Sequence, residues 1–213
     1  MLSIKKSVLS YIDVAHIHAV ILAGGEGRRM GGVDKGLALF QGQPLVQRAA
    51  QRLGTRVAKV SISANRNAAL YRALGYDVFD DGMLDYEGPL GGVLAALRRC
   101  TAPYLAILPC DVPFFPVDLV SVLANKLSRS TANIAMPLVT QADGAVFPDP
   151  VFMVMRASVL PDLEAYFAAG GRKITTWAGK AGLALVAFDA PQHAAQFEDA
   201  DTLAALQSLA QRE

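Results

Sequence analysis

Apolar runs and helix-type spacing alternate along the first half of the chain. Strands are predicted where short apolar or alternating runs occur, at residues 17–23, 57–63, 78–79 and 104–108. Helices are predicted where the spacing is helical, where proline opens a turn or where glycine ends one, at residues 44–53, 67–74, 88–99 and 116–127. Because strands and helices alternate, we expect right-handed crossovers and a parallel sheet with helices on both faces.

The second half of the chain follows this alternation less strictly. Strands are predicted at residues 132–138, 151–155 and 183–188, and helices at residues 158–169, 173–177 and 202–210. The turn-rich stretch QADGAVFPDP, residues 141–150, is expected to be a loop. The predicted fold class is α/β, a three-layer Rossmann-like arrangement with a mostly parallel central sheet. We expect residues 1–16 to form an N-terminal extension and residues 17–213 to form a single domain.

The composition is that of a folding chain with little excess charge. Of its 213 residues, 53% are hydrophobic and 18% are charged. A formal net charge of +1 argues against a broad nucleic-acid surface, and no apolar run is long enough for a spanning helix. Lys5 and Lys6 resemble the start of a signal peptide, but polar residues interrupt the apolar stretch after them. Because Cys100 and Cys110 are the only cysteines, we expect a reducing compartment, the cytoplasm. From the net charge and the lack of a long apolar run we expect no nucleic-acid or membrane partner.

A glycine-rich segment follows the first predicted strand directly. It reads LAGGEGRRMGGVDK, residues 22–35, and holds five glycines in fourteen positions. Glycines free backbone N–H groups to face an anion, and Arg28, Arg29 and Lys35 add positive charge at the same place. The segment lacks the G-K-[ST] ending of a Walker A loop and the third glycine of a dinucleotide fingerprint. It therefore indicates polyphosphate binding by a different motif.

Lys35 and Arg29 are the candidate catalytic cations of this segment. A substitution at a phosphate builds negative charge on its oxygens, and the phosphate group that leaves is an anion. Fixed cations stabilise both, and the loss of one such charge typically costs a few kcal/mol of barrier.

Asp111 is the candidate metal ligand. It follows the predicted strand 104–108 within the sequence PCDVP, where two prolines restrict the backbone. Mg²⁺ prefers oxygen ligands and usually takes one or two carboxylates together with substrate phosphate. Cys110, its neighbour, has no histidine placed beside it by any motif, so we expect a small buried cysteine and not a nucleophile.

The motif LAGG-x-x-RRMGG-x-DK resembles the signature of molybdenum cofactor guanylyltransferases, which are MobA-like members of the nucleotidyltransferase superfamily. The segment PCD-x-P is similar to the metal-binding strand end of these enzymes. The resemblance covers nearly the whole chain and implies the nucleotidyltransferase fold, with Mg²⁺ as cofactor. It implies transfer of GMP from GTP to the phosphate of molybdenum-molybdopterin, with release of pyrophosphate. Contacts with cofactor-insertion proteins or molybdoenzyme chaperones would follow from the same resemblance.

The resemblance also assigns substrate-binding residues. It implies that guanine and ribose lie along Leu22, Ala23 and Gly24. Residues 25–32, beginning with Gly25, would wrap the triphosphate, and Lys35 would contact phosphate. Asp81 matches a family aspartate that contacts the nucleotide, although an Asx turn would explain it equally simply. Gly24–Gly25 stand where related cytidylyltransferases carry Ala-Gly, which favours GTP over CTP.

The chain departs from the family pattern in its polar residues at three places. Ser63 stands where the family usually has a base-contacting Asn, and Asp149-Pro150 replaces His-Pro. Asp199 and Asp201 replace two asparagines; either could approach the metal, but we expect Asp201 to cap the last helix. Arg172 and Lys173 match a segment on the pterin side, where a solvated basic turn is a comparable interpretation.

Two other functions stay open from the residues alone. A sugar-phosphate nucleotidyltransferase would tend to carry Thr and Leu where this chain has Arg28 and Met30, and would need more length for sugar-binding elements. A nucleotide-binding module without turnover would not need both Lys35 and Asp111. Release of pyrophosphate from GTP and Mg²⁺, with and without molybdopterin, distinguishes these functions.

Overall fold

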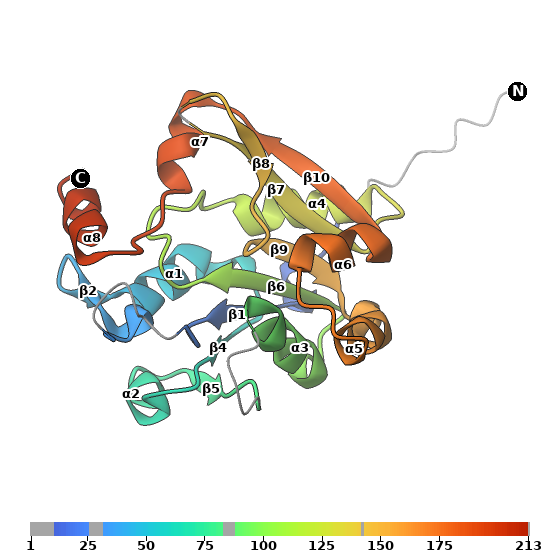
Figure 1. Ribbon diagram of the computed structural model, residues 1–213, viewed down its shortest axis with the longest axis horizontal. Coiled ribbons are helices and arrows are strands. Elements are labelled where there is room, and N and C mark those ends of the chain that lie inside the picture. Colours follow the sequence, from blue (N-terminus) through green and yellow to red (C-terminus); the bar gives the residue numbers. More distant parts are fainter. Residues whose placement is uncertain (1–10, 26–31, 83–87, 142, 213) are drawn as a thin grey trace, which may run out of the picture.

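A central sheet of eight strands organises the chain (Figure 1). The computed structural model describes residues 11–25, 32–82, 88–141 and 143–212. The strands of the sheet are β1 (Ile17–Leu22), β4 (Lys59–Ser63), β5 (Asp77–Phe79), β6 (Tyr104–Pro109), β7 (Ile134–Thr140), β8 (Val146–Pro148), β9 (Met153–Arg156) and β10 (Leu183–Phe188). Their order is β10-β7-β9-β6-β1-β4-β5, and β8 pairs with β7.

Most of the sheet is parallel, as the sequence pattern predicted. β1 pairs in parallel with β4 and β6, β4 pairs in parallel with β5, and β10 pairs in parallel with β7. β9 lies between β6 and β7 and is antiparallel to both. The carboxyl ends of β1, β4, β5 and β6 therefore meet at one edge of the sheet, where ligands bind in open α/β folds.

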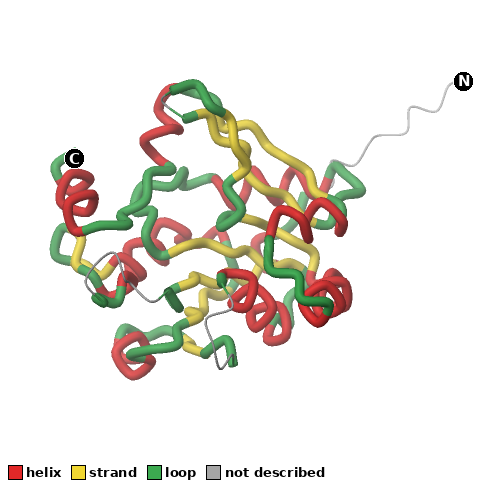
Figure 2. Tube along the Cα trace, in the orientation of Figure 1, coloured by secondary structure: helices red, strands yellow, loops and turns green. Residues whose placement is uncertain are grey.

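Helices cover both faces of this sheet (Figures 1 and 2). They are α1 (Leu45–Leu53), α2 (Ala68–Ala73), α3 (Pro89–Arg99), α4 (Leu119–Ser128), α5 (Leu160–Ala168), α6 (Ile174–Ala181), α7 (Pro191–Gln196) and α8 (Leu203–Ala210). Shorter elements are the 3₁₀ helices η1 (Val14–His16), η3 (Lys35–Leu37), η4 (Gly54–Arg56) and η5 (Ala157–Val159), and the hairpin β2 (Leu39–Phe40) with β3 (Gln43–Pro44). Within the described ranges, none of these helices is both long and apolar enough to cross a membrane.

The core lies in two layers, one on each face of the sheet. Ile21 of β1 belongs to an apolar cluster that includes α1, α2 and α4. Val20, the residue before Ile21, belongs to a second cluster that includes residues of α3, α5 and α6. Successive strand residues point to opposite faces, so a strand between two layers is apolar on both. Residues 17–21 are accordingly at most 5% exposed, and the three-layer α/β prediction is confirmed.

Several predicted elements differ from the structure. Residues 141–150 were expected to be a loop, but β8 lies within them and forms an antiparallel hairpin with β7. A strand of three residues with one partner carries too little periodicity to be seen in the sequence. The predicted helix at 116–127 begins only at Leu119, three residues after Pro116. The sequence pattern also missed α7 and the hairpin of β2 and β3.

Candidate active site

A cavity of about 470 Å³ lies beyond the carboxyl ends of β1, β4 and β6. Its lining includes Leu22, Ser63 and Pro109, the last residues of these three strands. The volume falls within the range of about 300–1,000 Å³ typical of small-molecule sites. Eight of the residues predicted for the site line this cavity: Leu22, Ala23, Gly24, Gly25, Lys35, Ser63, Asp81 and Asp111. Arg29, the ninth, lies outside the described residues.

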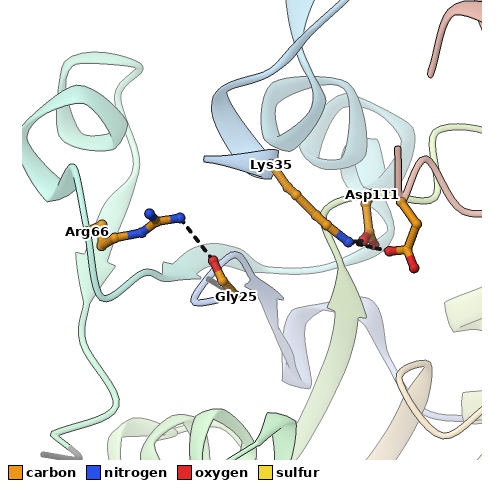
Figure 3. Close-up of polar contacts among 5 residues, drawn as sticks. Gly25, Lys35, Arg66 and Asp111 are labelled. Atoms are coloured by element: carbon orange, nitrogen blue, oxygen red, sulfur yellow. Dashed lines mark hydrogen bonds and ion pairs between the residues drawn. The ribbon is translucent and has the colours of Figure 1, made fainter. Parts of the chain in front are cut away.

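Lys35 joins two carboxylates at the edge of this cavity. Its ammonium donates to Asp111 Oδ2 at 2.9 Å and also to Asp201 Oδ1, as Figure 3 shows for the first of these. All three side chains are partly buried, with 19% of Lys35, 17% of Asp111 and 28% of Asp201 exposed. The direct contact between Lys35 and Asp111 is explained by the attraction of opposite charges in a partly desolvated site.

The two carboxylates keep Lys35 protonated. Burial is the largest single influence on the pKa of Lys35 and would lower it. The hydrogen bonds and charges of Asp201 and Asp111 outweigh burial and raise the pKa above its ordinary value. Lys35 therefore carries a full positive charge throughout the physiological pH range, as stabilisation of a polyphosphate requires.

Backbone contacts hold Asp111 between the first strand and the C-terminal segment. Cys110, the residue before it, donates its N–H to the carbonyl of Leu22 at 3.2 Å. The carbonyl of Asp111 accepts the N–H of Ala200 at 2.7 Å. Ala200 is fully buried between Asp199 and Asp201, so this bond brings both of these carboxylates to the site.

The expected helix cap at Asp201 is wrong. Thr202 is the N-cap residue of α8, and its hydroxyl accepts the N–H of Ala205 at 3.0 Å. Asp201 instead contacts Lys35. A hydroxyl at the N-cap position satisfies the free N–H of the first turn, which leaves the preceding carboxylate available for a cation from another part of the chain.

Two further carboxylates, those of Asp149 and Asp199, line the cavity. Burial, followed by the charges of Asp199 and Asp111, raises the pKa of Asp149 to about 6. Burial, followed by the charges of Asp201 and Asp111, also raises the pKa of Asp199. The sequence shows that Asp149 belongs to an Asp-Pro pair and Asp199 to an Asp-x-Asp-Thr segment. Nothing in the sequence shows that these two segments meet at one cavity.

These carboxylates supply the oxygen donors that a hard divalent cation requires. Asp111 and Asp199 line the same cavity, and mutual repulsion contributes to the raised pKa of Asp199. A cation would relieve that repulsion. Within the described ranges, no three His, Cys, Asp or Glu side chains are arranged to hold a metal without other ligands. The residues present therefore fit a cation such as Mg²⁺, which takes one or two carboxylates and completes its shell with phosphate and water.

Replacing Asp149 with asparagine is expected to stabilise the fold at neutral pH. The folded-state pKa of Asp149 is about 6 against an ordinary value of 3.8, so the folded chain binds more protons between these values. The free energy of unfolding therefore falls as the pH rises from about 3.8 to about 6. Asparagine does not ionise, so it avoids this fall, and its side-chain oxygen can still accept the N–H of Val151. We expect a gain on the order of 2 kcal/mol in unfolding free energy at pH 7.5, measured by urea denaturation. An equal gain at pH 4.5 would contradict this explanation.

The turn between β4 and α2 connects three segments of the site. Asn65 donates to Asp81 Oδ2 at 2.8 Å and accepts the Asp81 N–H at 3.1 Å. Arg66 donates to the carbonyls of Gly25 at 3.2 Å and Gly32 at 3.3 Å, the first of which is drawn in Figure 3. Two carbonyls of the glycine segment, those of Gly25 and Gly32, are thus bonded to one side chain of the turn after β4. No local pattern in the sequence indicated these contacts.

Two glycines lie where the chain packs closely at the cavity wall. A Cβ atom at Gly24 would lie 3.3 Å from Asn65 Nδ2, and one at Gly92 would lie 3.0 Å from Leu22 Cδ2. Gly24 and Gly92 therefore leave room for the side chains that shape the wall.

Cys110 is buried, and burial raises the pKa of its thiol well above the ordinary value, which fits the expectation of a cysteine that is not a nucleophile.

Arg172, predicted to lie on the pterin side, does not line the cavity among the described residues. Its guanidinium lies 3.9 Å from the centroid of the Phe167 ring and donates to the carbonyls of Phe167 and Gly171. Lys173 is exposed and directly precedes α6. The interpretation of this segment as a basic turn on the surface agrees with these contacts.

Comparison with known proteins identifies relatives along nearly the whole chain. Molybdenum cofactor guanylyltransferase from Bordetella petrii is 46% identical over 198 residues, covering 93% of this chain and 99% of the relative. The protein of the same name from Acidovorax ebreus is 46% identical over 206 residues, covering 93% and 97%. The crystal structure of molybdopterin-guanine dinucleotide biosynthesis protein A from Archaeoglobus fulgidus shares the fold, with a TM-score of 0.71 at 17% identity, covering 90% of this chain and 96% of that one.

A family described as the MobA-like NTP transferase domain matches residues 19–195, which contain the glycine segment, Lys35 and Asp111. The chain therefore belongs to the MobA-like NTP transferase family, as do the molybdenum cofactor guanylyltransferases to which it is similar.

Proposed function

We propose that this chain is a molybdenum cofactor guanylyltransferase that transfers GMP from GTP to the terminal phosphate of molybdenum-molybdopterin. Support comes from relatives with this name at 46% identity over nearly their whole length. The observation that carries the chemistry is the contact of Lys35 with Asp111 in a cavity at the carboxyl ends of β1 and β6. A cation and a carboxylate beside a glycine-rich strand end form a site for a triphosphate.

The reaction is an in-line substitution at the α-phosphorus of GTP. An oxygen of the acceptor phosphate forms the new P–O bond, and the bond to the β-phosphate breaks. Pyrophosphate leaves with the electron pair of that bond. The acceptor is already anionic at neutral pH, so the chain needs neither a nucleophile nor a general base of its own.

Lys35 stabilises the charge that develops in this substitution. In the described structure its ammonium is held by Asp111 and Asp201, both of which line the cavity. We propose that it turns from Asp111 to the phosphate oxygens when GTP binds, remaining next to Asp201. Asp111 would then hold Mg²⁺, which supplies charge neutralisation on the phosphate oxygens. Arg29, in the same glycine segment, is proposed as a second cation.

The nucleoside would lie along the end of β1. Leu22, Ala23 and Gly24 line the cavity together with Ser63 and Asp81, and we assign guanine and ribose to this wall. Asp81 is oriented by its two hydrogen bonds with Asn65, so its carboxylate can accept from ribose hydroxyls or from the guanine N1 and N2 groups. Ser63 is 2% exposed and can donate or accept at the base. Gly25, where the phosphate segment begins, is assigned to the triphosphate.

Cellular location and partners follow from the same proposal. Both cysteines are free thiols, as in proteins of a reducing compartment, and we place the enzyme in the cytoplasm. Its product would be passed on through transient contacts with cofactor-insertion proteins or molybdoenzyme chaperones. We propose no nucleic-acid or membrane partner.

Turnover of GTP is the decisive test. We expect release of pyrophosphate from GTP and Mg²⁺ only when molybdenum-molybdopterin is present, with the guanine dinucleotide detected by mass spectrometry. CTP should support at most about one hundredth of this rate, because a site that hydrogen-bonds the guanine edge leaves its polar groups unpaired with cytosine. Turnover with CTP but not GTP would contradict the base assignment. Absence of turnover with molybdopterin and with sugar phosphates would favour a nucleotide-binding module.

A further inference from the structure

Lys35 opens a short turn whose geometry depends on the residue before it. The carbonyl of Asp34 accepts the N–H groups of Leu37 and Ala38, each at 3.1 Å, and Ala38 N–H also bonds the carbonyl of Lys35 at 3.1 Å to complete η3. The direction in which the Lys35 side chain leaves the backbone is therefore set by the position of Asp34. From this turn the Lys35 ammonium contacts Asp111, which lies 76 positions further along the chain.

The side chain of Asp34 is buried, with 8% of the residue exposed. One carboxylate oxygen accepts the hydroxyl of Tyr71, and the other accepts Asn67 Nδ2 at 3.0 Å. Both donors belong to α2 and its N-cap, and Tyr71 is fully buried. A buried carboxylate is costly unless it is hydrogen-bonded, so these donors determine where Asp34 can lie.

Gly36 leaves the space that this contact requires. A Cβ atom at Gly36 would overlap the Tyr71 hydroxyl and would lie 3.1 Å from the Cβ of Ala23. Glycine is needed here for close approach, because a side chain would push Tyr71 away from Asp34. Burial and the Asp34 carboxylate together raise the pKa of Tyr71, so its hydroxyl remains a donor over the whole physiological range.

We propose that Tyr71, acting through Asp34, is a positioning residue that aims the Lys35 ammonium into the phosphate end of the cavity. This assignment rests on the proposed function, since it concerns the aim of the cation that stabilises the transferred phosphate. Tyr71 and Asp34 touch no reacting atom; they fix the turn from which Lys35 projects. The hydroxyl is the part of Tyr71 that carries this role, whereas its ring belongs to the apolar core.

Tyr71→Phe tests the proposal, with Tyr104→Phe as the matched control. Tyr104 Oη accepts from Arg156 at 3.2 Å, and this residue does not line the active-site cavity, so the control removes a hydroxyl of the same kind elsewhere. At a temperature where both variants are folded by circular dichroism, we expect Tyr71→Phe to lower kcat about 10-fold. The KM for GTP should change less than about threefold, since the aim of Lys35 matters most in the transition state. Tyr104→Phe should keep the wild-type kcat.

A second measurement does not depend on turnover. The amides of Leu37 and Ala38 bond to Asp34, so their hydrogen exchange should become faster in Tyr71→Phe and stay unchanged in Tyr104→Phe. Gly36→Ala, which displaces the hydroxyl, should lower kcat by a similar factor. Combining it with Tyr71→Phe should cost no more than Gly36→Ala alone, because both changes act on one contact.

The outcomes separate this inference from the proposed function. Wild-type turnover together with unchanged kcat and unchanged exchange in Tyr71→Phe would overturn the positioning role and leave the function standing. A wild type without turnover, but with faster exchange in Tyr71→Phe, would remove the function while keeping the structural link between Tyr71 and the Lys35 turn. Multiplicative losses in the double variant would also overturn the proposal.

Discussion

Replacing Lys35 with methionine is expected to lower kcat/KM for guanylyl transfer by about 10²- to 10³-fold. Methionine keeps the length and apolar stem of the side chain and removes only the charge. In the described structure, the ammonium is the partner of both Asp111 and Asp201. Its loss removes charge stabilisation of the transition state and leaves two carboxylates facing each other without this cation.

The same variant should also be less stable. The pKa of Lys35 is raised in the folded chain, so the ammonium contributes its full stability below about pH 10 and loses it only as the pH rises through the folded-state value. We therefore expect a loss of about 1–2 kcal/mol at pH 7.5, measured by urea denaturation, because a partly buried pair is broken on one side.

Two variants serve as controls for Lys35→Met. Lys35→Arg keeps the positive charge but replaces the compact ammonium with a larger planar guanidinium, so we expect an intermediate loss of activity of roughly 10-fold. Lys59→Met breaks the exposed ion pair with Asp77, which is formed outside the cavity, and should change neither activity nor stability by much. Full activity of Lys35→Met in the presence of GTP and molybdopterin would rule out Lys35 as the phosphate-stabilising cation.

Replacing Asp111 with asparagine is expected to have the second large effect. Asparagine has nearly the same shape and retains one neutral oxygen, but it lacks the charge that attracts a divalent cation. We expect kcat/KM for GTP to fall by about 10³-fold when it is measured at the Mg²⁺ concentration that saturates the wild type. The Mg²⁺ concentration needed for half-maximal rate should rise at least about 10-fold, because a ligand of the metal is weakened.

Asp118→Asn is the matched control for Asp111→Asn. Asp118 stands at the N-cap position of α4, where its side chain makes no capping hydrogen bond, and it does not line the cavity. We expect wild-type kinetics and wild-type Mg²⁺ dependence from it. An Asp111→Asn enzyme with unchanged Mg²⁺ dependence would show that the metal is bound elsewhere, and Asp149, Asp199 and Asp201 would then be the carboxylates to replace next.

Local pattern was enough to predict the residues at the strand ends. The run IHAVIL is apolar on every residue but one, and such a run is stable only between two packed layers, as β1 is. A strand of this kind must end at the edge of the sheet, so Leu22, Gly24 and Gly25 were correctly expected at one edge. The same reasoning placed Asp111 after β6, and parallel pairing of β1 with β6 brings both ends together.

The second half of the site was not predictable in this way. Asp149 follows a hairpin strand of three residues, and Asp201 precedes a helix whose cap is the neighbouring Thr202. Each turn has an ordinary local explanation, so the local pattern carried no sign of a shared cavity. The contact of Asp201 with Lys35 joins residues 166 positions apart, and it arises because Ala200 pairs with the backbone of Asp111.

The sequence by itself determined the α/β class, the end of β1 near Leu22, and the presence of Lys35 and Asp111 at the cavity. Those features depend on periodicity and residue type, which act over a few neighbouring positions. Only the tertiary structure decided that Lys35 contacts Asp111 and Asp201. The same holds for the hydrogen bond from Tyr71 to Asp34, the residue before Lys35. Such contacts depend on how distant segments pack, and packing is set by the whole core and not by any local stretch of the chain.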